Sequence, residues 1–289
     1  PDLVARSLVT QESKQLAIIV NNIRNPIYGD LILGFENLAI EHGYFVNICT
    51  GNQNVDAYME NFAARRIDGV LVETLREKYH LWEIEKLLSA GIRVVHFGHT
   101  GIDLKRISCV ETDYTAAMET IISYLCRLGH VDIAYLSGLE PEQSYDTRIE
   151  GYLAATGSRG LDRNGELLFT TDAPSETDMA DGRSLARTFL DSGKRATAVV
   201  CTNDLMATGA LSLFVERGVR VPDDVSVVGI DNAYISEITS PRLTTLSIDY
   251  REVGRRAFEL LLNDIRWDSA GYHLNTFELI ERESCAPPG

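Results

Sequence analysis

The sequence predicts an α/β protein with two lobes, each a doubly wound parallel sheet, and with several chain crossovers between the lobes. Apolar runs without polar alternation, such as LAIIV at 16–20, are typical of strands buried on both faces of a parallel sheet. Such runs alternate with helix-period patterns along the chain. The alternation restarts near residue 132, and 289 residues are too many for one small core.

The first block of the chain supplies the first predicted lobe. Buried strands are predicted at 16–20, 44–49, 69–72, 92–97 and 107–110. Helix-period apolar segments lie between them, and helices are predicted from Pro26 to Gly43 and over 56–66, 82–89 and 115–128. Proline suits the first turn of a helix and glycine its end, which sets the limits of the first of these helices.

The second block repeats the pattern from a strand at 132–137. It continues with a polar loop at 140–147, a helix around 148–156, a weak strand at 167–169 and a helix at 179–190. The buried runs Thr197–Cys201 and Val225–Ile230 then flank a helix that ends at Gly218.

The remaining segments are too few to form a third core. They are a strand at 243–248, a helix at 253–263 and a strand at 277–281. We therefore expect them to complete the two earlier cores, with the chain crossing between lobes more than once. The expected parts are a hinge segment at 1–15, a first lobe of residues 16–127 plus 247–270, and a second lobe of residues 130–243 plus 273–284.

Polar side chains follow two of the predicted strands. Asn203 and Asp204 follow the first of them, and Asp231 follows the second. In open α/β sheets, ligands bind in the crevice outside the carboxyl ends of the strands. The alternative is that Asn203 or Asp204 caps the next helix and that Asp231 caps a short helix after it. Together these residues favour a site for a polar small molecule.

The composition narrows the class of protein. Apolar content of 45% with 24% charged residues is ordinary for a globular protein. No run of 18 apolar residues and no signal-like opening is present, so we expect a soluble cytoplasmic protein with no membrane partner. The five scattered cysteines are expected to be reduced. A net charge of −15 repels nucleic acid, so any DNA contact must come from a separate module or a local segment.

The first fifteen residues, PDLVARSLVTQESKQ, stand apart from both lobes. Pro1 suits a first helical turn, and Leu3, Val4 and Leu8 would lie on one side of that helix. Such a short helix is not stable in water unaided, and a frayed terminus is the alternative. A chain that begins on proline without methionine is expected to be a fragment of a longer protein.

Several segments in order resemble the lactose-repressor/galactose-repressor (LacI/GalR) family of bacterial transcription regulators. They include NNIRNPIYGDLILGFENLAIEHGY, RRIDGVLV, VETDYTAAM, LGHVDIAYLSG, TRIEGYLAA, TNDLMATGAL, VPDDVSVVGIDN and SPRLTTLSIDYREVGRRAFELLL, with ERESC near the end. The resemblance covers essentially the whole chain. It implies a ligand-sensing core of the type I periplasmic-binding-protein fold, without the N-terminal helix-turn-helix module.

The resemblance also implies which residues bind the effector. Arg148 of TRIEGY resembles the arginine that binds the effector in most members, and Asp231 the aspartate that accepts from its hydroxyls or amines. Other implied contacts are Asn203, Asp113, Ser144, Asn25, Ile27 and Tyr28. The alternatives are that Arg148 is a surface arginine paired with Glu150 or Glu142, and that Tyr28 is an ordinary core tyrosine.

The ARSL segment resembles the hinge helix of the family. The resemblance implies that Leu8, with Ala5 and Arg6 before it in the same segment, is the apolar wedge that paired hinge helices insert into the minor groove of the operator. This agrees with a segment that orders on DNA and is loose without it.

The chain departs from the family pattern at three places expected to surround the ligand. It has Gly98-His99 where many members have Asp-Arg, Glu73-Thr74 where they have a turn of small residues of the Pro-Ser type, and Tyr114 where Asn is usual. His96 and His99 form an H-x-x-H pattern, but no further ligand set lies nearby. We therefore expect neither a metal nor a cofactor.

The expected function is a dimeric transcription regulator. Its effector, a sugar more readily than a nucleobase, is expected to bind between the lobes and control operator DNA binding. The homodimer is expected to form through helices of both lobes, including residues 253–263. A periplasmic solute-binding protein is the alternative. No enzyme is expected, because G-x-G-x-x-G, G-x-x-x-x-G-K-[ST], G-x-S-x-G and H-E-x-x-H are all absent.

Overall fold

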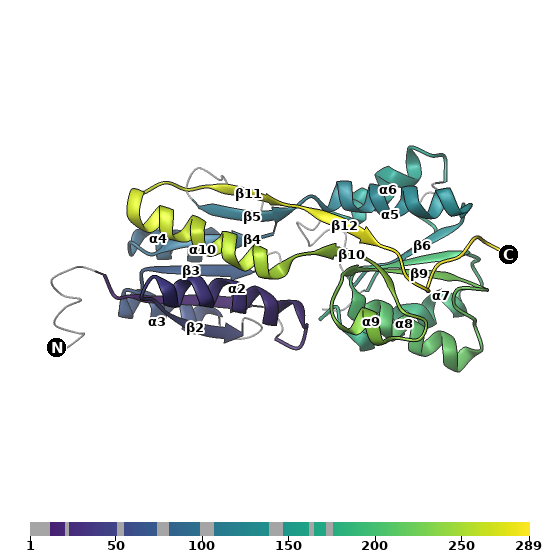
Figure 1. Ribbon diagram of the computed structural model, residues 1–289, viewed down its shortest axis with the longest axis horizontal. Coiled ribbons are helices and arrows are strands. Elements are labelled where there is room, and N and C mark those ends of the chain that lie inside the picture. The colour runs from purple at the N-terminus through teal and green to yellow at the C-terminus, as the bar shows by residue number, and fades with distance from the viewer. Residues whose placement is uncertain are drawn as a thin grey trace. The chain divides into compact units, whose positions relative to one another are not determined.

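The computed structural model describes residues 12–20, 23–50, 55–73, 81–98, 107–138, 147–161, 165–171 and 176–289 (Figure 1). The chain forms two compact units. Unit 1 comprises Pro1–Thr112 and Asp249–Asn275, and unit 2 comprises Asp113–Ile248 and Thr276–Gly289. The chain therefore passes from one unit to the other more than once, as the leftover C-terminal segments predicted.

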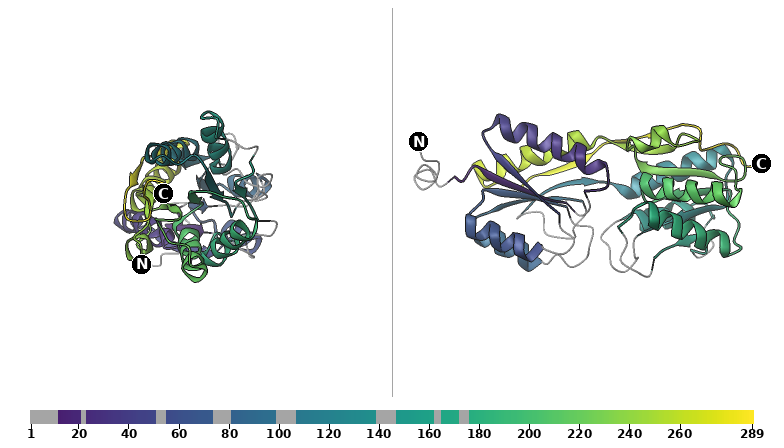
Figure 2. Two further views of the ribbon diagram at one scale, coloured as in Figure 1. Left: turned by 90° about the vertical axis from the view of Figure 1, so that its right-hand side faces the viewer. Right: turned by 90° about the horizontal axis from the view of Figure 1, so that it is seen from below.

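Unit 1 is built on a parallel six-stranded sheet of order β11-β5-β4-β3-β1-β2. Its strands are β1 (Gln15–Val20), β2 (Phe45–Thr50), β3 (Gly69–Glu73), β4 (Arg93–Phe97), β5 (Ser108–Thr112) and β11 (Tyr272–Asn275). Its helices are α2 (Ile27–Glu41), α3 (Val55–Arg65), α4 (Leu81–Ser89) and α10 (Tyr250–Trp267). Helices α2 and α10 cover one face of this sheet, and α3 and α4 cover the other (Figure 2).

Helix α10 belongs to unit 1 because its backbone packs directly on that of α2. A Cβ atom at Gly34 would lie 2.0 Å from the carbonyl oxygen of Arg251, and one at Gly254 would lie 2.0 Å from that of Leu31. Phe35 and Phe258 also meet edge to face, with ring centroids 5.5 Å apart. Two glycines thus allow a helix from late in the chain to complete the core of the first unit.

Unit 2 repeats the plan with a sheet of order β12-β10-β9-β8-β6-β7. Its strands are β6 (Ile133–Leu136), β7 (Leu168–Phe169), β8 (Ala198–Cys201), β9 (Ser226–Asp231), β10 (Thr244–Ile248) and β12 (Phe277–Ile280). Its helices are α5 (Tyr114–Leu128), α6 (Arg148–Gly157), α7 (Met179–Asp191), α8 (Asp204–Arg217) and the short α9 (Ile235–Ile238). The predicted fold class, two parallel-sheet α/β lobes, is confirmed.

The structure differs from the expected arrangement in the position of α5. Residues 113–127 were expected in the first lobe, but α5 lies in unit 2. It packs there against α6 and β12. A Cβ atom at Gly151 of α6 would lie 2.9 Å from the Cα of Thr115, so the two helices are in close contact.

Two edge strands also differ from the expectation. Strand β12 pairs antiparallel with β10, whereas the sheet was expected to be parallel throughout. Strand β11 was not expected as a strand, and it extends the first sheet by pairing with β5. None of the described helices is both long enough and apolar enough to cross a membrane.

Candidate functional site

The carboxyl ends of β6, β8 and β9 lie at one edge of the unit 2 sheet, because these strands are parallel neighbours. Each strand is followed by buried polar residues. Ser137 follows β6, Thr202 and Asn203 follow β8, and Asp231 is the last residue of β9. This edge has the position at which open α/β sheets bind ligands.

Arg148 lies at this edge, at the first residue of α6. It is 8% exposed, and its Nη1 atom donates to the carbonyl oxygen of Thr202 at 3.2 Å. Its guanidinium carbon lies 3.9 Å from the centroid of the Tyr114 ring. The alternative of a surface arginine is wrong, because Arg148 is buried whereas Glu150 is exposed; Glu142, the other partner considered, lies outside the described residues.

The guanidinium of Arg148 lies over the ring of Tyr114, the first residue of α5. A cation over an aromatic face gains electrostatic attraction, and a guanidinium can also stack. The sequence marked Tyr114 only as a departure from the family pattern. Nothing in the sequence pairs it with Arg148, because this contact depends on how α5 packs against α6.

Thr202 is a residue that sequence reasoning missed. Its hydroxyl donates to the carbonyl oxygen of Leu136 at 3.3 Å, and it accepts from the backbone N–H of Gly138 at 3.3 Å. The hydroxyl of Tyr135 lies 3.1 Å away. Thr202 therefore joins the ends of β6 and β8 and presents the carbonyl that orients Arg148. Its signal in the sequence is a polar residue directly after a buried strand.

Asn203 and Asp113 both begin helices. The Oδ1 atom of Asn203 accepts from the N–H of Met206 at 2.9 Å, and its Nδ2 donates to the carbonyl of Thr177 at 2.9 Å. Asp113 accepts from the N–H of Ala116 at 2.9 Å at the start of α5. The capping alternative therefore applies to Asn203. These two side chains set where α8 and α5 begin.

Asp231 is 4% exposed and has a φ of 115°. It does not cap α9, whose N-cap is Tyr234 without a side-chain hydrogen bond. The neighbouring Asp204 is fully buried. Burial and the charge of Asp231 raise the pKa of Asp204 well above its usual range. The edge of the sheet thus carries a cation at the end of β8 and two acidic side chains between α8 and β9.

The three candidates of unit 1 lie at the start of α2. The side chain of Asn25 accepts from the N–H of Ile27 at 3.3 Å, and its carbonyl accepts from the N–H of Tyr28 at 3.2 Å. All three are buried, and Tyr28 is 3% exposed. Asn25 therefore shapes the turn that leads into α2.

Several sequence candidates fall on parts of the chain that the structure does not describe. Ser144, the hinge residues Ala5, Arg6 and Leu8, and His99 and Thr74 lie outside the described residues. Glu73, the last residue of β3, is 4% exposed. His96 is buried, with its Nδ1 atom 3.1 Å from the carbonyl oxygen of Gly98. Among the described residues there is no cluster of three potential metal ligands.

The sequence is similar to a known domain family over its second half and to known proteins over most of its length. The sequence pattern of the periplasmic binding protein-like domain matches residues 122–285. The HTH-type transcriptional repressor PurR of Mannheimia succiniciproducens is 31% identical over 271 residues, 92% of this chain and 78% of that protein. The PurR of Vibrio campbellii is 33% identical over 272 residues, 92% of this chain and 79% of that protein.

Solved structures resemble the whole chain. A transcriptional regulator CelR–cellobiose complex is 25% identical with a TM-score of 0.85, covering 97% of this chain and 89% of that one. The LacI family regulator CcpA of Weissella paramesenteroides with bound sucrose is 25% identical with a TM-score of 0.83, covering 94% and 99%. Fold and relatives define a two-lobed protein of the periplasmic-binding-protein type. This chain covers more than three quarters of the length of relatives that are more than 30% identical to it. The chain therefore belongs to the LacI family of transcriptional regulators, which are not enzymes.

Proposed function

We propose that this chain is the sensor of a cytoplasmic repressor and that its effector is a sugar or sugar derivative. The effector contacts Arg148 and Asp231 of unit 2, with Asn203, Asp113 and Ser144 nearby. Asn25, Ile27 and Tyr28 of unit 1 close on the other side of the same ligand. The observation that carries the proposal is the buried Arg148, oriented by Thr202 and Tyr114 at the end of a parallel strand.

The chemistry of these groups suits a hydroxyl-rich ligand. A guanidinium presents a rigid fork of donors to ring and hydroxyl oxygens, and it has no acceptor. A carboxylate such as that of Asp231 supplies the complementary acceptor for hydroxyl protons. A sugar hydroxyl can satisfy either partner, and away from water each hydrogen bond is strengthened by the low local dielectric.

Two solved relatives were determined with sugars bound, cellobiose in one and sucrose in the other. They support a sugar for this chain as well. A nucleobase is the second candidate, because the curated relatives at 31% and 33% identity carry the name PurR. The flat ring of a base would also suit the aromatic and guanidinium planes of Tyr114 and Arg148.

A thermal-shift screen tests the proposal. Mono- and disaccharides form one arm and purine bases the other, each added to the same protein. A ligand at 100 times its Kd stabilises the folded state by about 2.7 kcal/mol, so true effectors raise the Tm in a concentration-dependent way. A rise with sugars supports the first candidate and a rise with bases the second. Unchanged Tm in both arms would contradict the proposed site.

The same proposal includes the output of the regulator. Effector binding between the units changes their relative angle, and this is coupled to pairing of the hinge helices in a homodimer on operator DNA. Such coupling is typically ~1–3 kcal/mol and is reciprocal between effector and DNA. Residues 253–263 of α10 contribute to the dimer. Two apolar side chains of unit 1 are exposed, Ile40 of α2 at 60% and Phe45 of β2 at 67%. Their exposure supports the proposal that a second copy of the chain covers this surface of unit 1.

A further inference from the structure

The end of β9 has an unusual backbone. Asp231 has a φ of 115° and Asn232 a φ of 54°, so two consecutive non-glycine residues lie in the left-handed region. Such conformations cost roughly 1–3 kcal/mol per residue and persist only where the surroundings over-determine them. The groups that hold residues 231–233, here called the β9 turn, therefore decide how Asp231 is presented.

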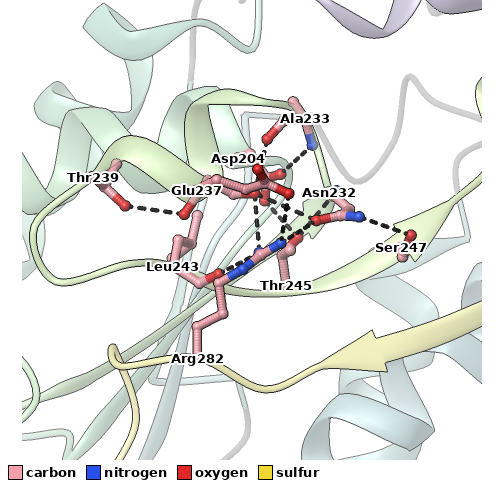
Figure 3. A network of polar contacts seen from close by, with 10 residues as sticks. Asp204, Asn232, Ala233, Glu237, Thr239, Leu243, Thr245, Ser247 and Arg282 are labelled. Carbon is pink, nitrogen blue, oxygen red and sulfur yellow. Dashed lines mark hydrogen bonds and ion pairs between the residues drawn. The ribbon is translucent and has the colours of Figure 1, made fainter.

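Asp204, at the start of α8, contacts the β9 turn (Figure 3). Its Oδ2 atom accepts from the backbone N–H of Ala233 at 2.8 Å, and its Oδ1 atom accepts from the hydroxyl of Thr245 at 2.6 Å. The same Thr245 hydroxyl oxygen lies 3.3 Å from the N–H of Asn232. One buried carboxylate thus reaches two residues of the turn, directly and through Thr245.

Gly229 of β9 leaves the space that the side chain of Asp204 occupies. A Cβ atom at Gly229 would lie 2.2 Å from the Oδ1 atom of Asp204. No side chain can occupy that position while Asp204 remains where it is. The glycine of the GID segment is therefore explained by the approach of Asp204 to β9.

Arg282, just after β12, also contacts the β9 turn (Figure 3). Its Nη2 atom donates to the Oδ1 atom of Asn232 at 2.7 Å, and its Nη1 atom donates to the hydroxyl of Ser236 at 3.0 Å and the carbonyl of Leu243 at 2.8 Å. The Nδ2 atom of Asn232 donates to the hydroxyl of Ser247 at 3.1 Å. The side chain of Asn232 is thereby held at both ends.

We propose that Asp204 and Arg282 are positioning residues for effector recognition, which fix the β9 turn and with it the direction in which Asp231 offers its carboxylate. They act through Asp231 and touch no effector themselves. The part that concerns the effector rests on the proposed function. The part that concerns the turn does not, because it stands on contacts within unit 2.

The electrostatics agree with this role. The charge of Arg282 acts to lower the pKa of Asp204, opposing the effects of burial and of Asp231. Arg282 therefore compensates part of the repulsion between the two acids. Its own side chain is 11% exposed, with Glu237 at 3.5 Å on the solvent side.

Amide hydrogen exchange tests the turn without any ligand. In the variant Asp204→Ala, the amide of Ala233 loses its acceptor, and we expect it to exchange roughly 10- to 100-fold faster. Asp204→Asn should stay close to wild type, because the amide oxygen still accepts from Ala233 and the amide nitrogen can face the hydroxyl of Thr245. Arg282→Lys should accelerate exchange of the backbone amide of Asn232. A lysine cannot make the forked contacts that hold the side chain of Asn232, so the turn should open more often.

A matched control distinguishes this role from general loss of stability. Asp178 is another unit 2 carboxylate that accepts backbone N–H groups, from Ala180 at 2.8 Å and Asp181 at 3.1 Å. Asp178→Ala should destabilise α7 while the amide of Ala233 exchanges as in wild type. Unchanged exchange at Ala233 in Asp204→Ala would overturn the proposal.

Titration with cellobiose, sucrose and adenine as probes tests the link to recognition. Whichever probe binds wild type should bind Asp204→Ala and Arg282→Lys about tenfold more weakly, the factor that a lost buried hydrogen bond corresponds to, and Asp204→Asn nearly as well as wild type. Faster exchange with unchanged probe affinity would overturn the positioning role. If no probe binds wild type, it is the proposed effector class that fails, and the exchange data alone then decide whether Asp204 and Arg282 hold the turn.

Discussion

At the scale of the residue, the central contact joins Tyr114 and Arg148. The guanidinium carbon lies 3.9 Å from the ring centroid, and Arg148 is 8% exposed. A buried cation–π contact of this kind contributes roughly 0.5–2 kcal/mol. This contact holds the guanidinium of Arg148 against the ring of Tyr114 before an effector binds.

We therefore expect Tyr114→Ala to weaken effector binding several-fold to about thirtyfold, the factor that corresponds to the loss of this contact. Tyr114→Phe keeps the ring and should bind within about twofold of wild type. Isothermal titration of both variants checks this. Equal affinities for the alanine variant and wild type would mean that the ring does not orient Arg148.

His130 gives a second prediction at this scale, one of pH dependence. It is 1% exposed, with Nδ1 2.9 Å from the Thr197 hydroxyl and Nε2 2.9 Å from the carbonyl of Ala286. Burial lowers the pKa of His130 below its ordinary value of 6.5. The unfolded chain therefore takes up a proton more readily, so the free energy of unfolding should fall as the pH drops below about 6.5.

Urea unfolding at about pH 8 and pH 5.5 measures this loss. The variant His130→Gln retains a donor and an acceptor but does not titrate, so the difference between the two pH values should be smaller for it. A wild-type protein and a variant with the same pH dependence would exclude His130 as the group responsible.

At the scale of the element, glycines at helix crossings decide which helices pair. Gly254 of α10 meets the backbone of α2, where an added Cβ would lie 2.0 Å from the carbonyl oxygen of Leu31. Gly254→Ala must separate the two helices, and we expect a loss of about 1–3 kcal/mol or more in the free energy of unfolding. Gly29 of the same helix α2 has no atom within 4 Å of its added Cβ.

Gly29→Ala is therefore the matched control. It should leave the free energy of unfolding within about 1 kcal/mol of wild type, on the stabilising side, because alanine favours the helix. Denaturant unfolding of the two variants compares them. A Gly254→Ala protein as stable as Gly29→Ala would mean that α10 and α2 are not in backbone contact.

Elements with long apolar runs could be predicted from the sequence, and edge elements could not. β1 and β9 were predictable because strands buried on both faces show as unbroken apolar stretches. β11 has the sequence YHLN with Tyr272 and Leu274 exposed, and only its pairing with β5 makes it a strand. The unit to which α5 belongs could not be predicted either, since its contact with Gly151 of α6 is tertiary.

The site divides in the same way. Arg148 could be named as a candidate from the TRIEGY motif that resembles the family, and Asp231 from its position at the end of a predicted strand. Their surroundings could not, because Tyr114 and Thr202 reach Arg148 across elements, and Arg282 reaches Asn232, the neighbour of Asp231, from beyond β12. A polar residue after a buried strand was the only available signal, and Thr202 carried it.

At the scale of the whole molecule, we propose that the hinge segment connects effector binding to DNA binding. Leu8 lies outside the described residues, and its role rests on resemblance to the family. In the full-length protein, Leu8→Ala should weaken operator binding by roughly several-fold or more, since an apolar wedge stabilises the kinked duplex. Affinity for non-specific DNA should be nearly unchanged, because phosphate contacts dominate there. Fluorescence anisotropy with operator and scrambled duplexes checks both, and an unaltered operator affinity would mean that Leu8 does not insert.

The most direct test of the central claim is calorimetric titration of the ligand with the largest thermal shift into wild type, Arg148→Ala and Arg159→Ala. Arg159 lies just beyond α6 and pairs with Glu119 at the surface, so it controls for loss of an arginine in the same region. Arg148→Ala should lose binding by about a hundredfold or beyond detection, because both its forked donors and its stacked plane are removed. Arg159→Ala should bind like wild type. Equal affinity of Arg148→Ala and wild type would contradict the account.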